Sequence, residues 1–351
     1  MQPDAPSPVR AGEELDRAAL DAWLASRHPE LGSILEISQF PGGYSNLTYL
    51  LRTTAGAYVL RRPPFGANIK GGHDMGREFR VLSLLEPVYP LAPRPRAFCG
   101  PEEAGGAPFY LMERVEGVIL RPGKPPSPPP DVDTMRELSR AAIRLLADLH
   151  RLDLEATGLG ALGKPEGYTR RQVEGWIGRY ARARTDEIAD MEAAAGWLME
   201  GMPEDPPPAF VHNDFKYDNL VLNPERLPEI RAVLDWEMST VGNPLMDLGA
   251  ALAYWIEPGD PAALRPFNLT YLPGNLTRQE AVDWYAACSG RDVSDMLYYY
   301  VFGCFKLGVI AQQIYARFKQ GLTRDPRFGA LIFAVRACGQ QAQRAIRSGS
   351  L

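Results

Sequence analysis

The chain has 351 residues, a net charge of −5, 45% hydrophobic residues and 23% charged residues. This composition is typical of an ordinary globular protein with enough chain for two compact units. The charge excludes a general attraction to nucleic acid or to an anionic membrane, so we expect neither as a partner. Four cysteines lie far apart in the sequence, without metal-binding or redox spacing. They predict free thiols and a cytoplasmic location.

The first third of the chain predicts a helix over 13–27, then β-strands over 33–40, 47–53 and 58–62. The turn that ends in Ser45 and Asn46 contains two glycines and joins the first two strands. Such a turn brings backbone N–H groups close to phosphates, or is an ordinary hairpin; the sequence leaves both open. A helix over 73–85 and a strand over 109–115 follow.

Proline-rich connectors over 121–130 and 203–208 separate the remaining elements. Thr134 and Glu137 predict a capping box at the start of one helix, and Thr277 and Glu280 predict another. Beyond Asp247 the pattern is helical, over 244–255, 292–319 and 327–346. The apolar stretch over 297–311 contains a lysine and is too short to span a bilayer, so it predicts a buried core helix.

The segment from 210 to 247 carries the chemistry. Asp214 lies five residues before Asn219, and Asp235 follows a short apolar run. Phosphoryl transfer needs a carboxylate that accepts the proton of the attacking hydroxyl, and oxygen ligands for Mg²⁺. Two short strands, 219–222 and 230–234, predict a hairpin that returns Asp235 toward Asn219. The alternative is a solvated turn in which these polar residues have no shared task.

The order His212, Asp214, Lys216, Asn219 is similar to the H-x-D-x-K-x-x-N catalytic loop of the protein-kinase-like superfamily. The segments 235–237 and 242–248 resemble the aminoglycoside phosphotransferase family. Within that family the chain looks most like the kinase-like domain at the head of certain acyl-CoA dehydrogenase fusion proteins. The resemblance runs from about Phe40 to the last helices. It implies an α+β, protein-kinase-like two-lobe fold, with a nucleotide-binding lobe over 1–115 and a mainly helical catalytic lobe over 116–351.

The resemblance also implies ATP and Mg²⁺ as cofactors and a role for each matching residue. Asp214 would be the base, Asn219 and Asp235 the metal ligands, and Lys216 the group that stabilises charge on the transferred phosphoryl group. His212 and Asp247 would brace the loop. The predicted nucleotide-binding residues are Arg61, which stands where kinases carry a lysine, its acidic partner Glu78, and Ser45, Asn46, Met112, Glu113 and Val115. Arg62 should point to the opposite, solvated face of its strand.

The predicted acceptor is a small molecule, because only about a dozen residues separate Asp235 from Asp247. Residues 164–184 contain six cations against two acids, and the next 21 residues contain seven acids and no cation. A charge-complementary helix pair explains this pattern. Alternatively, the cluster binds an anionic acceptor. The resemblance to the acyl-CoA dehydrogenase-associated domain implies that this acceptor is a compound such as a hydroxyacyl-CoA. The acceptor-binding residues would then be Arg170, Arg171, Arg179 and Trp176.

Three other functions remain open at this point. The chain could be a non-catalytic nucleotide-binding pseudokinase, or a kinase of the aminoglycoside type. It could also be a metal-dependent hydrolase built on His212, Asp214, Asp218 and Asp235, although four histidines without an H-x-x-x-H pair give a transition metal little support. The sequence also leaves open the choice of ATP or GTP and whether the chain forms a homodimer.

Overall fold

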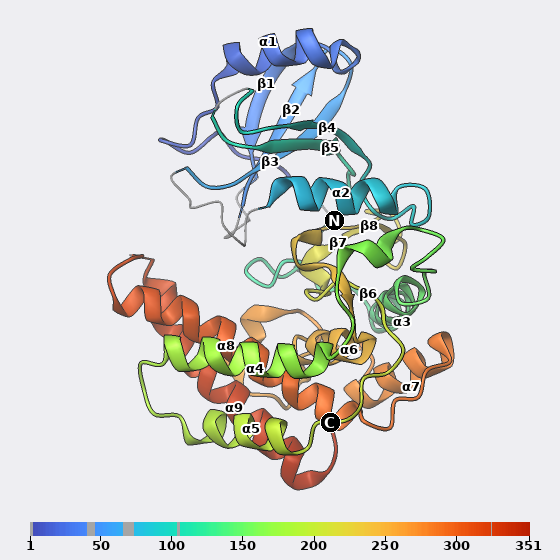
Figure 1. Ribbon diagram of the computed structural model, residues 1–351, viewed down its shortest axis with the longest axis vertical. Coiled ribbons are helices and arrows are strands. Elements are labelled where there is room, and N and C mark those ends of the chain that lie inside the picture. Colours follow the sequence, from blue (N-terminus) through green and yellow to red (C-terminus); the bar gives the residue numbers. More distant parts are fainter. Residues whose placement is uncertain (1–2, 41–45, 66–73, 104–105, 324) are drawn as a thin grey trace. The chain divides into compact units, whose positions relative to one another are not determined.

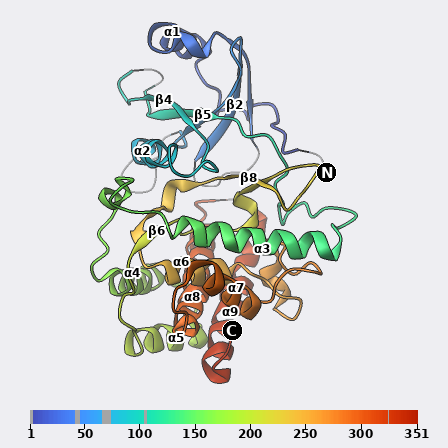
Figure 2. The ribbon, with the colours of Figure 1, turned by 90° about the vertical axis from the view of Figure 1, so that its right-hand side faces the viewer.

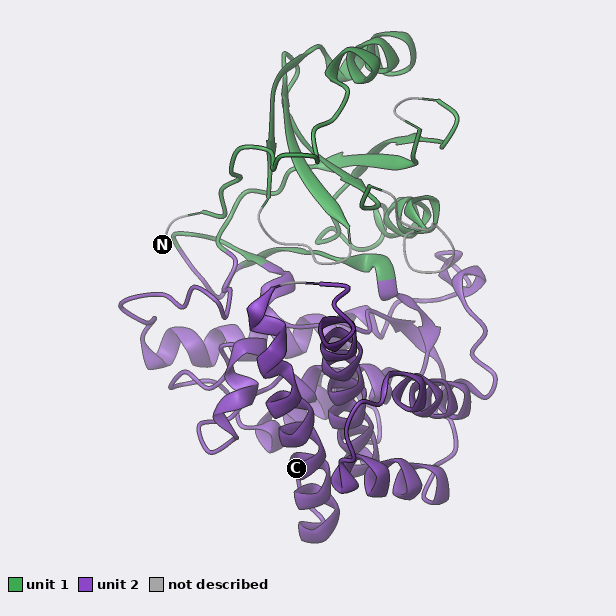
Figure 3. Ribbon diagram, turned by 90° about the vertical axis from the view of Figure 1, so that its left-hand side faces the viewer, with its two compact units in different colours: residues 1–118, 221–225, 230–237 green, residues 119–220, 226–229, 238–351 purple. Residues whose placement is uncertain are grey.

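The computed structural model of the chain describes residues 3–40, 46–65, 74–103, 106–323 and 325–351 (Figure 1). The chain divides into two compact units (Figure 3). The first unit comprises Met1–Val118, Val221–Glu225 and Ile230–Glu237, and the second comprises Ile119–Leu220, Arg226–Glu229 and Met238–Leu351. The two later segments of the first unit include Asp235. The boundary drawn at residue 115 from the sequence did not include them.

The first unit is built on a five-stranded sheet. Its strands lie in the order β1 (Ile34–Gln39), β2 (Leu47–Thr53), β3 (Ala57–Arg62), β5 (Phe109–Glu113) and β4 (Pro95–Cys99), and every neighbouring pair is antiparallel. The first three strands and β5 match the predicted strands to within two residues. The shared register places Arg61 of β3 opposite Tyr110 of β5.

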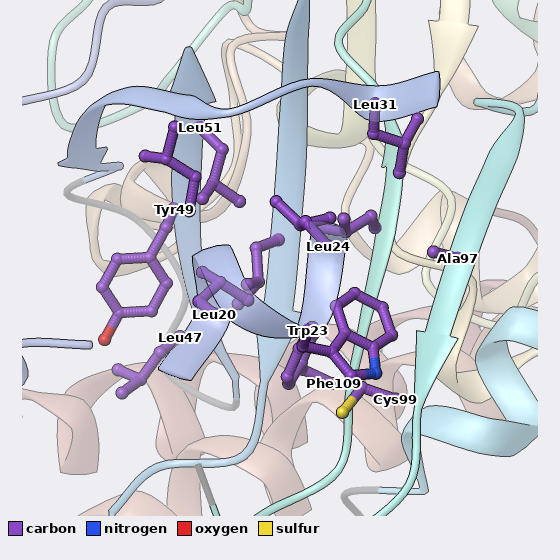
Figure 4. Close-up of a cluster of buried hydrophobic side chains, with 13 residues drawn as sticks. Leu20, Trp23, Leu24, Leu31, Leu47, Tyr49, Leu51, Ala97, Cys99 and Phe109 are labelled. Atoms are coloured by element: carbon purple, nitrogen blue, oxygen red, sulfur yellow. The ribbon is translucent and has the colours of Figure 1, made fainter. Parts of the chain in front are cut away.

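The core of this unit lies between the sheet and helix α1 (Arg17–Arg27). Figure 4 shows Trp23 and Leu24 of α1 directed toward side chains of the sheet, among them Phe109, whose ring centroid lies 5.1 Å from that of Trp23. The helix begins at Arg17, later than predicted, because the Asp16 side chain accepts a hydrogen bond from Ala19 N and caps it there.

Helix α2 (Met75–Leu85) begins after Asp74, whose side chain caps it by accepting a hydrogen bond from Arg77 N. Strands β7 (Leu220–Leu222) and β8 (Ile230–Val233) pair as the predicted hairpin. Together, α2 and the segment that follows β8 supply the three carboxylates around Arg61 described below.

Arg62 corrects one prediction, because only 8% of the residue is exposed. Strand alternation does direct its side chain away from that of Arg61. On that face, however, the guanidinium carbon lies 3.8 Å from the centre of the Phe65 ring, and Nε donates a hydrogen bond to the Pro63 carbonyl oxygen. The aromatic ring, rather than solvent, therefore covers the cation.

The second unit is mainly helical. Its helices are α3 (Val132–Leu149), α4 (Tyr168–Ala183), α5 (Ala189–Glu200), α6 (Pro244–Ala253), α7 (Arg278–Ser289), α8 (Met296–Lys319) and α9 (Leu331–Ser348). Helix α8 packs against both α6 and α9, and the three lie side by side in Figures 1 and 2. Strands β6 (Ala209–Val211) and β9 (Thr240–Gly242) form a short antiparallel sheet. The chain enters the predicted catalytic loop directly from β6.

Helices α6 and α8 touch through their backbones. A Cβ atom built on Gly303 of α8 would overlap the Gly249 carbonyl oxygen of α6, and one built on Gly249 would overlap the Tyr299 carbonyl oxygen of α8. Only glycine permits this approach, in which the two backbones lie closer together than in ordinary ridge-into-groove packing. The crossing fixes the spacing between the residues that the two helices carry.

Several helix boundaries differ from the predicted ones for local reasons. The predicted capping box of Thr134 and Glu137 is wrong, because Asp131 caps α3 by accepting a hydrogen bond from Thr134 N. The box of Thr277 and Glu280 is confirmed at the start of α7. Helix α8 begins at Met296 rather than at 292, because the Asp292 side chain accepts from Ser294 N and holds a turn. Within the described ranges, no helix combines the length and the apolar character needed to cross a bilayer.

Candidate active site

In the first unit, Arg61 and Glu78 form the predicted ion pair. Arg61 Nη1 lies 2.6 Å from Glu78 Oε1, and the two side chains are only 9% and 2% exposed. Burial raises the pKa of the Glu78 carboxyl, and the neighbouring Arg61 charge opposes that shift. A buried ion pair of this kind fixes the position of both groups. The guanidinium is thereby held at the end of β3.

Two further carboxylates approach the same guanidinium. Arg61 Nη2 lies 2.9 Å from Asp235 Oδ1 and 3.5 Å from Glu237 Oε2. Asn46 Nδ2 donates to Glu237 Oε2 at 2.7 Å, so Asn46 belongs to this cluster as well. One cation therefore faces three carboxylates, so the cluster carries an excess of negative charge. Asp235 has a backbone φ of 69°, an unusual conformation for a non-glycine residue that is enriched at functional sites.

The other predicted nucleotide-binding residues lie on or near β5. Met112 is buried in the sheet, opposite Val59 of β3, which fits core packing. The Glu113 carboxylate lies 3.5 Å from Arg96 Nη2. The Val115 backbone N–H has no hydrogen-bond partner in the described part of the chain, so it is available to a ligand. Ser45 lies outside the described residues.

In the second unit, the predicted catalytic loop brings Asp214, Lys216 and Asn219 together. Lys216 Nζ lies 2.7 Å from Asp214 Oδ2. Asn219 Nδ2 donates to the Asp214 carbonyl oxygen at 2.8 Å and to Asp214 Oδ2 at 3.1 Å. The Asp214 carboxylate is thus oriented by a cation and an amide, as a general base must be. The Lys216 ammonium also lies 4.9 Å from the centre of the Tyr254 ring, just after α6.

Asp247 braces the loop backbone, as predicted. Its carboxylate, fully buried at the start of α6, accepts hydrogen bonds from the backbone N–H of His212 at 2.6 Å and of Asn213 at 2.8 Å. His212 also contributes, since its Nδ1 accepts a hydrogen bond from Asp214 N at 3.2 Å. Asp247 and His212 therefore both hold the backbone of the loop. The prediction that His212 is catalytic stays untested.

His150, the residue that follows α3, holds Asp247 in place. The two side chains are fully buried, and His150 Nε2 lies 3.1 Å from Asp247 Oδ2. His150 Nδ1 lies 2.8 Å from the Tyr285 hydroxyl. A neutral imidazole that donates from Nε2 to the carboxylate can accept from this hydroxyl at Nδ1. Burial lowers the pKa of His150, and the hydrogen bond to Asp247 opposes that shift.

This arrangement predicts an acid-sensitive fold. Because the pKa of His150 in the folded chain is below the ordinary value of about 6.5, the unfolded chain binds more protons just below pH 6.5. Stability due to His150 is therefore lost as the pH falls from 6.5 toward the folded pKa, by up to about 1.4 kcal/mol per pH unit. His150→Gln keeps a donor and an acceptor but does not titrate. Urea unfolding between pH 5 and 8 should show the wild type losing stability relative to this variant on acidification. Parallel profiles would contradict the prediction.

The structure separates the three predicted acceptor-binding arginines. Arg170 and Arg179 are nine residues apart on α4 and therefore point in opposite directions. Arg170 pairs with Glu174, and Arg171 donates to the carbonyl oxygens of two residues just before the helix. The guanidinium of Arg179 instead stacks over the buried Trp176 ring, 4.4 Å from its centre. Of the predicted set, only Arg179 and Trp176 are brought together.

Some residues of these clusters were missed in the sequence. Glu237 lies in the segment 235–237 that carries the family resemblance, but the sequence predicts no role for it. His150 and Lys306 are separated from the loop by about sixty and ninety residues. Asn213 has a backbone φ of 67°, and Lys306 Nζ donates to its carbonyl oxygen at 2.7 Å. A lysine within an apolar helix was the one available signal for Lys306, because a buried ammonium needs a partner.

No group of three or more His, Cys, Asp or Glu side chains within the described ranges could hold a metal ion. A site for Mg²⁺ needs less from the protein, since this ion keeps several waters and accepts a single carboxylate and a single amide oxygen. Asp235 and Asn219 offer these donor types, each within its own unit.

Known proteins were compared with the chain in sequence and in structure. The sequence profile of the phosphotransferase enzyme family matches residues 36–301. Acyl-CoA dehydrogenase family member 11 of Gallus gallus is 32% identical over 325 residues, which cover 90% of this chain and 41% of that protein. A homoserine kinase of Chelativorans sp. (strain BNC1) is 28% identical over 285 residues, which cover 77% of each protein.

A crystal structure from Ralstonia eutropha JMP134, named as a candidate aminoglycoside phosphotransferase, matches with a TM-score of 0.81 and 28% identity over 95% of this chain and 99% of that one. The chain spans about two fifths of the length of the acyl-CoA dehydrogenase family member 11 proteins that it matches. The family match and the similarity to the acyl-CoA dehydrogenase relatives confirm the resemblance seen in the sequence. The chain therefore has a protein-kinase-like fold and belongs to the phosphotransferase enzyme family.

Proposed function

We propose that the chain transfers the γ-phosphoryl group of ATP to a hydroxyl group of a small molecule, with Mg²⁺ as the cofactor. The observation that carries this proposal is the loop in which Asp214 is held by Lys216 and Asn219. A base, a cation and a metal-binding amide on one short loop are the groups that phosphoryl transfer requires. Membership of the phosphotransferase enzyme family supports the same reaction.

In this proposal Asp214 accepts the proton of the attacking hydroxyl. Its carboxylate is held at Oδ2 by two donors, so it presents a fixed acceptor to the substrate. Lys216 would leave Asp214 and stabilise the charge that develops on the transferred phosphoryl oxygens. The exchange would start from the 2.7 Å contact between the two side chains.

The remaining residues bind the nucleotide and the metal. Asn219 and Asp235 supply oxygen ligands to Mg²⁺, which neutralises phosphate charge when it is bound. Arg61, held by Glu78, clamps phosphate oxygens, and Asn46 steadies Glu237 beside it. The Val115 N–H and the Glu113 carbonyl oxygen hydrogen-bond to the adenine, while Met112 packs against it. Ser45 belongs to this proposed set on sequence grounds alone.

The proposed acceptor is an anionic hydroxyl compound such as a hydroxyacyl-CoA. Similarity to acyl-CoA dehydrogenase family proteins over 90% of this chain supports an acyl-CoA, and the homoserine kinase supports a small hydroxyl acceptor. The Ralstonia structure favours an aminoglycoside as the second candidate. Because aminoglycosides are polycationic, the cations near Asp214 argue against them.

A panel of acceptors tests the proposal. We expect phosphoryl transfer from ATP to a hydroxyacyl-CoA, and little or none to kanamycin, because cations near the base repel a cationic acceptor. Product formation should stop when EDTA removes Mg²⁺ and should return when Mg²⁺ is added in excess. GTP in place of ATP determines the nucleotide preference in the same assay.

The non-catalytic alternative gives a different result. A pseudokinase would bind ATP in the presence of Mg²⁺ but transfer no phosphoryl group to any acceptor, including water. Zinc-supplemented, magnesium-free buffer supplies the control for the hydrolase alternative, which alone predicts activity there.

A further inference from the structure

Lys306 is a buried lysine in the middle of α8. The residue is 4% exposed, and its flanking residues on the helix are apolar. Its Nζ donates a hydrogen bond to the Asn213 carbonyl oxygen at 2.7 Å. An ammonium has three N–H donors, and no second acceptor contacts this one in the described part of the chain. A buried ammonium with unused donors is costly unless an anion or water meets them.

The surroundings of Lys306 are cationic and aromatic. Its Nζ lies 5.7 Å from the centre of the Trp176 ring, and the Arg179 guanidinium carbon lies 4.4 Å from the same centre. Helices α4 and α8, which carry these residues, pack against each other. The buried cation, the ring and the exposed Arg179 therefore form one continuous cluster, from the interior of the second unit to its surface.

This cluster lies within electrostatic range of the proposed base. Burial lowers the pKa of Lys306, the charges of Asp214 and Asp247 raise it, and Lys216 and Arg179 lower it further. Charged groups of both signs therefore act on Lys306. Asp247 is already neutralised locally by two backbone N–H groups and His150. Because burial disfavours the charged form of Lys306, an anion bound beside it would stabilise the ammonium.

We propose that Lys306, Trp176 and Arg179 form an anion-binding subsite that holds the acceptor while its hydroxyl reaches Asp214. The subsite rests on the proposed function. It adds to that function a place where the charged group of the acceptor binds. The chemistry that fits is a hydroxyl compound with a carboxylate or phosphate. The Lys306 ammonium takes the anion, and Arg179, which lies over the Trp176 ring, closes the outer end.

A purely structural role for Lys306 makes a different prediction. If the ammonium only holds the Asn213 carbonyl oxygen, its loss should disturb the loop and Asp214. Binding and rate should then be affected equally for all acceptors. If it binds the acceptor, its loss should weaken the binding of anionic acceptors and leave the binding of neutral acceptors nearly unchanged. The matched pair of an anionic and a neutral acceptor therefore separates the two roles.

The experiment measures equilibrium binding and initial rates for Lys306→Met, with Lys319→Met as the control. Lys319 lies on the same helix and also faces an aromatic ring, that of Tyr315, but it is exposed. The probes are 3-hydroxybutyrate, its neutral methyl ester and 3-hydroxybutyryl-CoA. We expect the Kd of at least one anionic probe to rise about 10- to 100-fold in Lys306→Met, as for the loss of a charge-assisted hydrogen bond. The ester and the KM for ATP should change less than about threefold, and Lys319→Met should resemble the wild type in every measurement.

The two anionic probes distinguish the source of the charge. Weaker binding of 3-hydroxybutyrate assigns a carboxylate to the subsite, whereas an effect confined to the CoA thioester assigns a phosphate. Equal losses for the anion and the ester would overturn the subsite, and so would a wild type that binds neither anion. Anion binding that depends on Lys306, in a protein that transfers no phosphoryl group, would uphold the subsite and refute the proposed function instead.

Discussion

Asp214→Asn is expected to reduce phosphoryl transfer to the best acceptor by about 10²- to 10⁴-fold, the range for removal of a general base. Asparagine keeps the shape of the side chain but accepts a proton poorly. Lys216 and Asn219 would lose a charged acceptor, yet the loop would remain held by Asp247. The measurement is the initial rate of product formation at saturating ATP, together with the Kd of ATP, which should change little.

Asp218→Asn provides the matched control for this prediction. Asp218 lies four residues further along the same loop and pairs with Arg121 at 3.0 Å rather than with Lys216. If the chain is the proposed kinase, Asp218→Asn should lower the rate of phosphoryl transfer by less than about tenfold, because a partly exposed ion pair contributes little. A rate for Asp214→Asn equal to that of the wild type would remove Asp214 from the mechanism. Equal, large losses in both variants would favour the hydrolase alternative.

Arg61→Met is expected to lower the free energy of unfolding by about 3–5 kcal/mol at pH 7, because it leaves the buried Glu78 carboxylate without its partner. The pKa of Glu78 is already raised by burial, and the variant removes the charge that opposes this. Glu78 should then take up a proton more readily, so the loss of stability should shrink as the pH falls. Urea unfolding at pH 5, 6 and 7 measures both effects, and the Kd of ATP should rise in parallel.

Arg52→Met serves as the control for the loss of an arginine from the same sheet. Arg52 on β2 lies 3.7 Å from Glu36 on β1, and both side chains are more than half exposed, so the expected change is at most about 0.5 kcal/mol. Arg61→Lys tests the geometry of the guanidinium, since one ammonium lacks the fork that contacts Glu78 and Asp235 together. A stability of Arg61→Met equal to that of Arg52→Met would refute the importance of the buried pair.

The sequence predicted well those features that local residues determine. The loop contacts of Asp214 involve residues two and five positions away, and the hairpin of β7 and β8 needs only a short turn. The pairing of Arg61 with Glu78 crosses seventeen residues, and the resemblance to kinases supplied it. In each case a short spacing or a known pattern carried the information.

Contacts between distant segments could not be read in the same way. Nothing near Lys306 in the sequence indicates that it reaches Asn213, since that contact depends on how α8 packs in the second unit. The assignment of Arg170 and Arg171 to one acceptor site with Arg179 did not consider the directions in which side chains leave a helix. These directions place Arg170 and Arg179 on opposite sides of α4. Arg62 was misjudged because strand alternation gives the side of the sheet but not the presence of Phe65 on that side.

The backbone contact between α6 and α8 has a consequence for how this protein can diversify. Asp247 lies two residues from Gly249 on α6, and Lys306 lies three residues from Gly303 on α8. Asp247 and Lys306 therefore both lie close to a helix contact at which any side chain larger than that of glycine would overlap the facing backbone. Changes of acceptor preference in descendants of this chain should arise through exchanges at Trp176, Arg179 and Lys306 themselves, while the two glycines stay invariant.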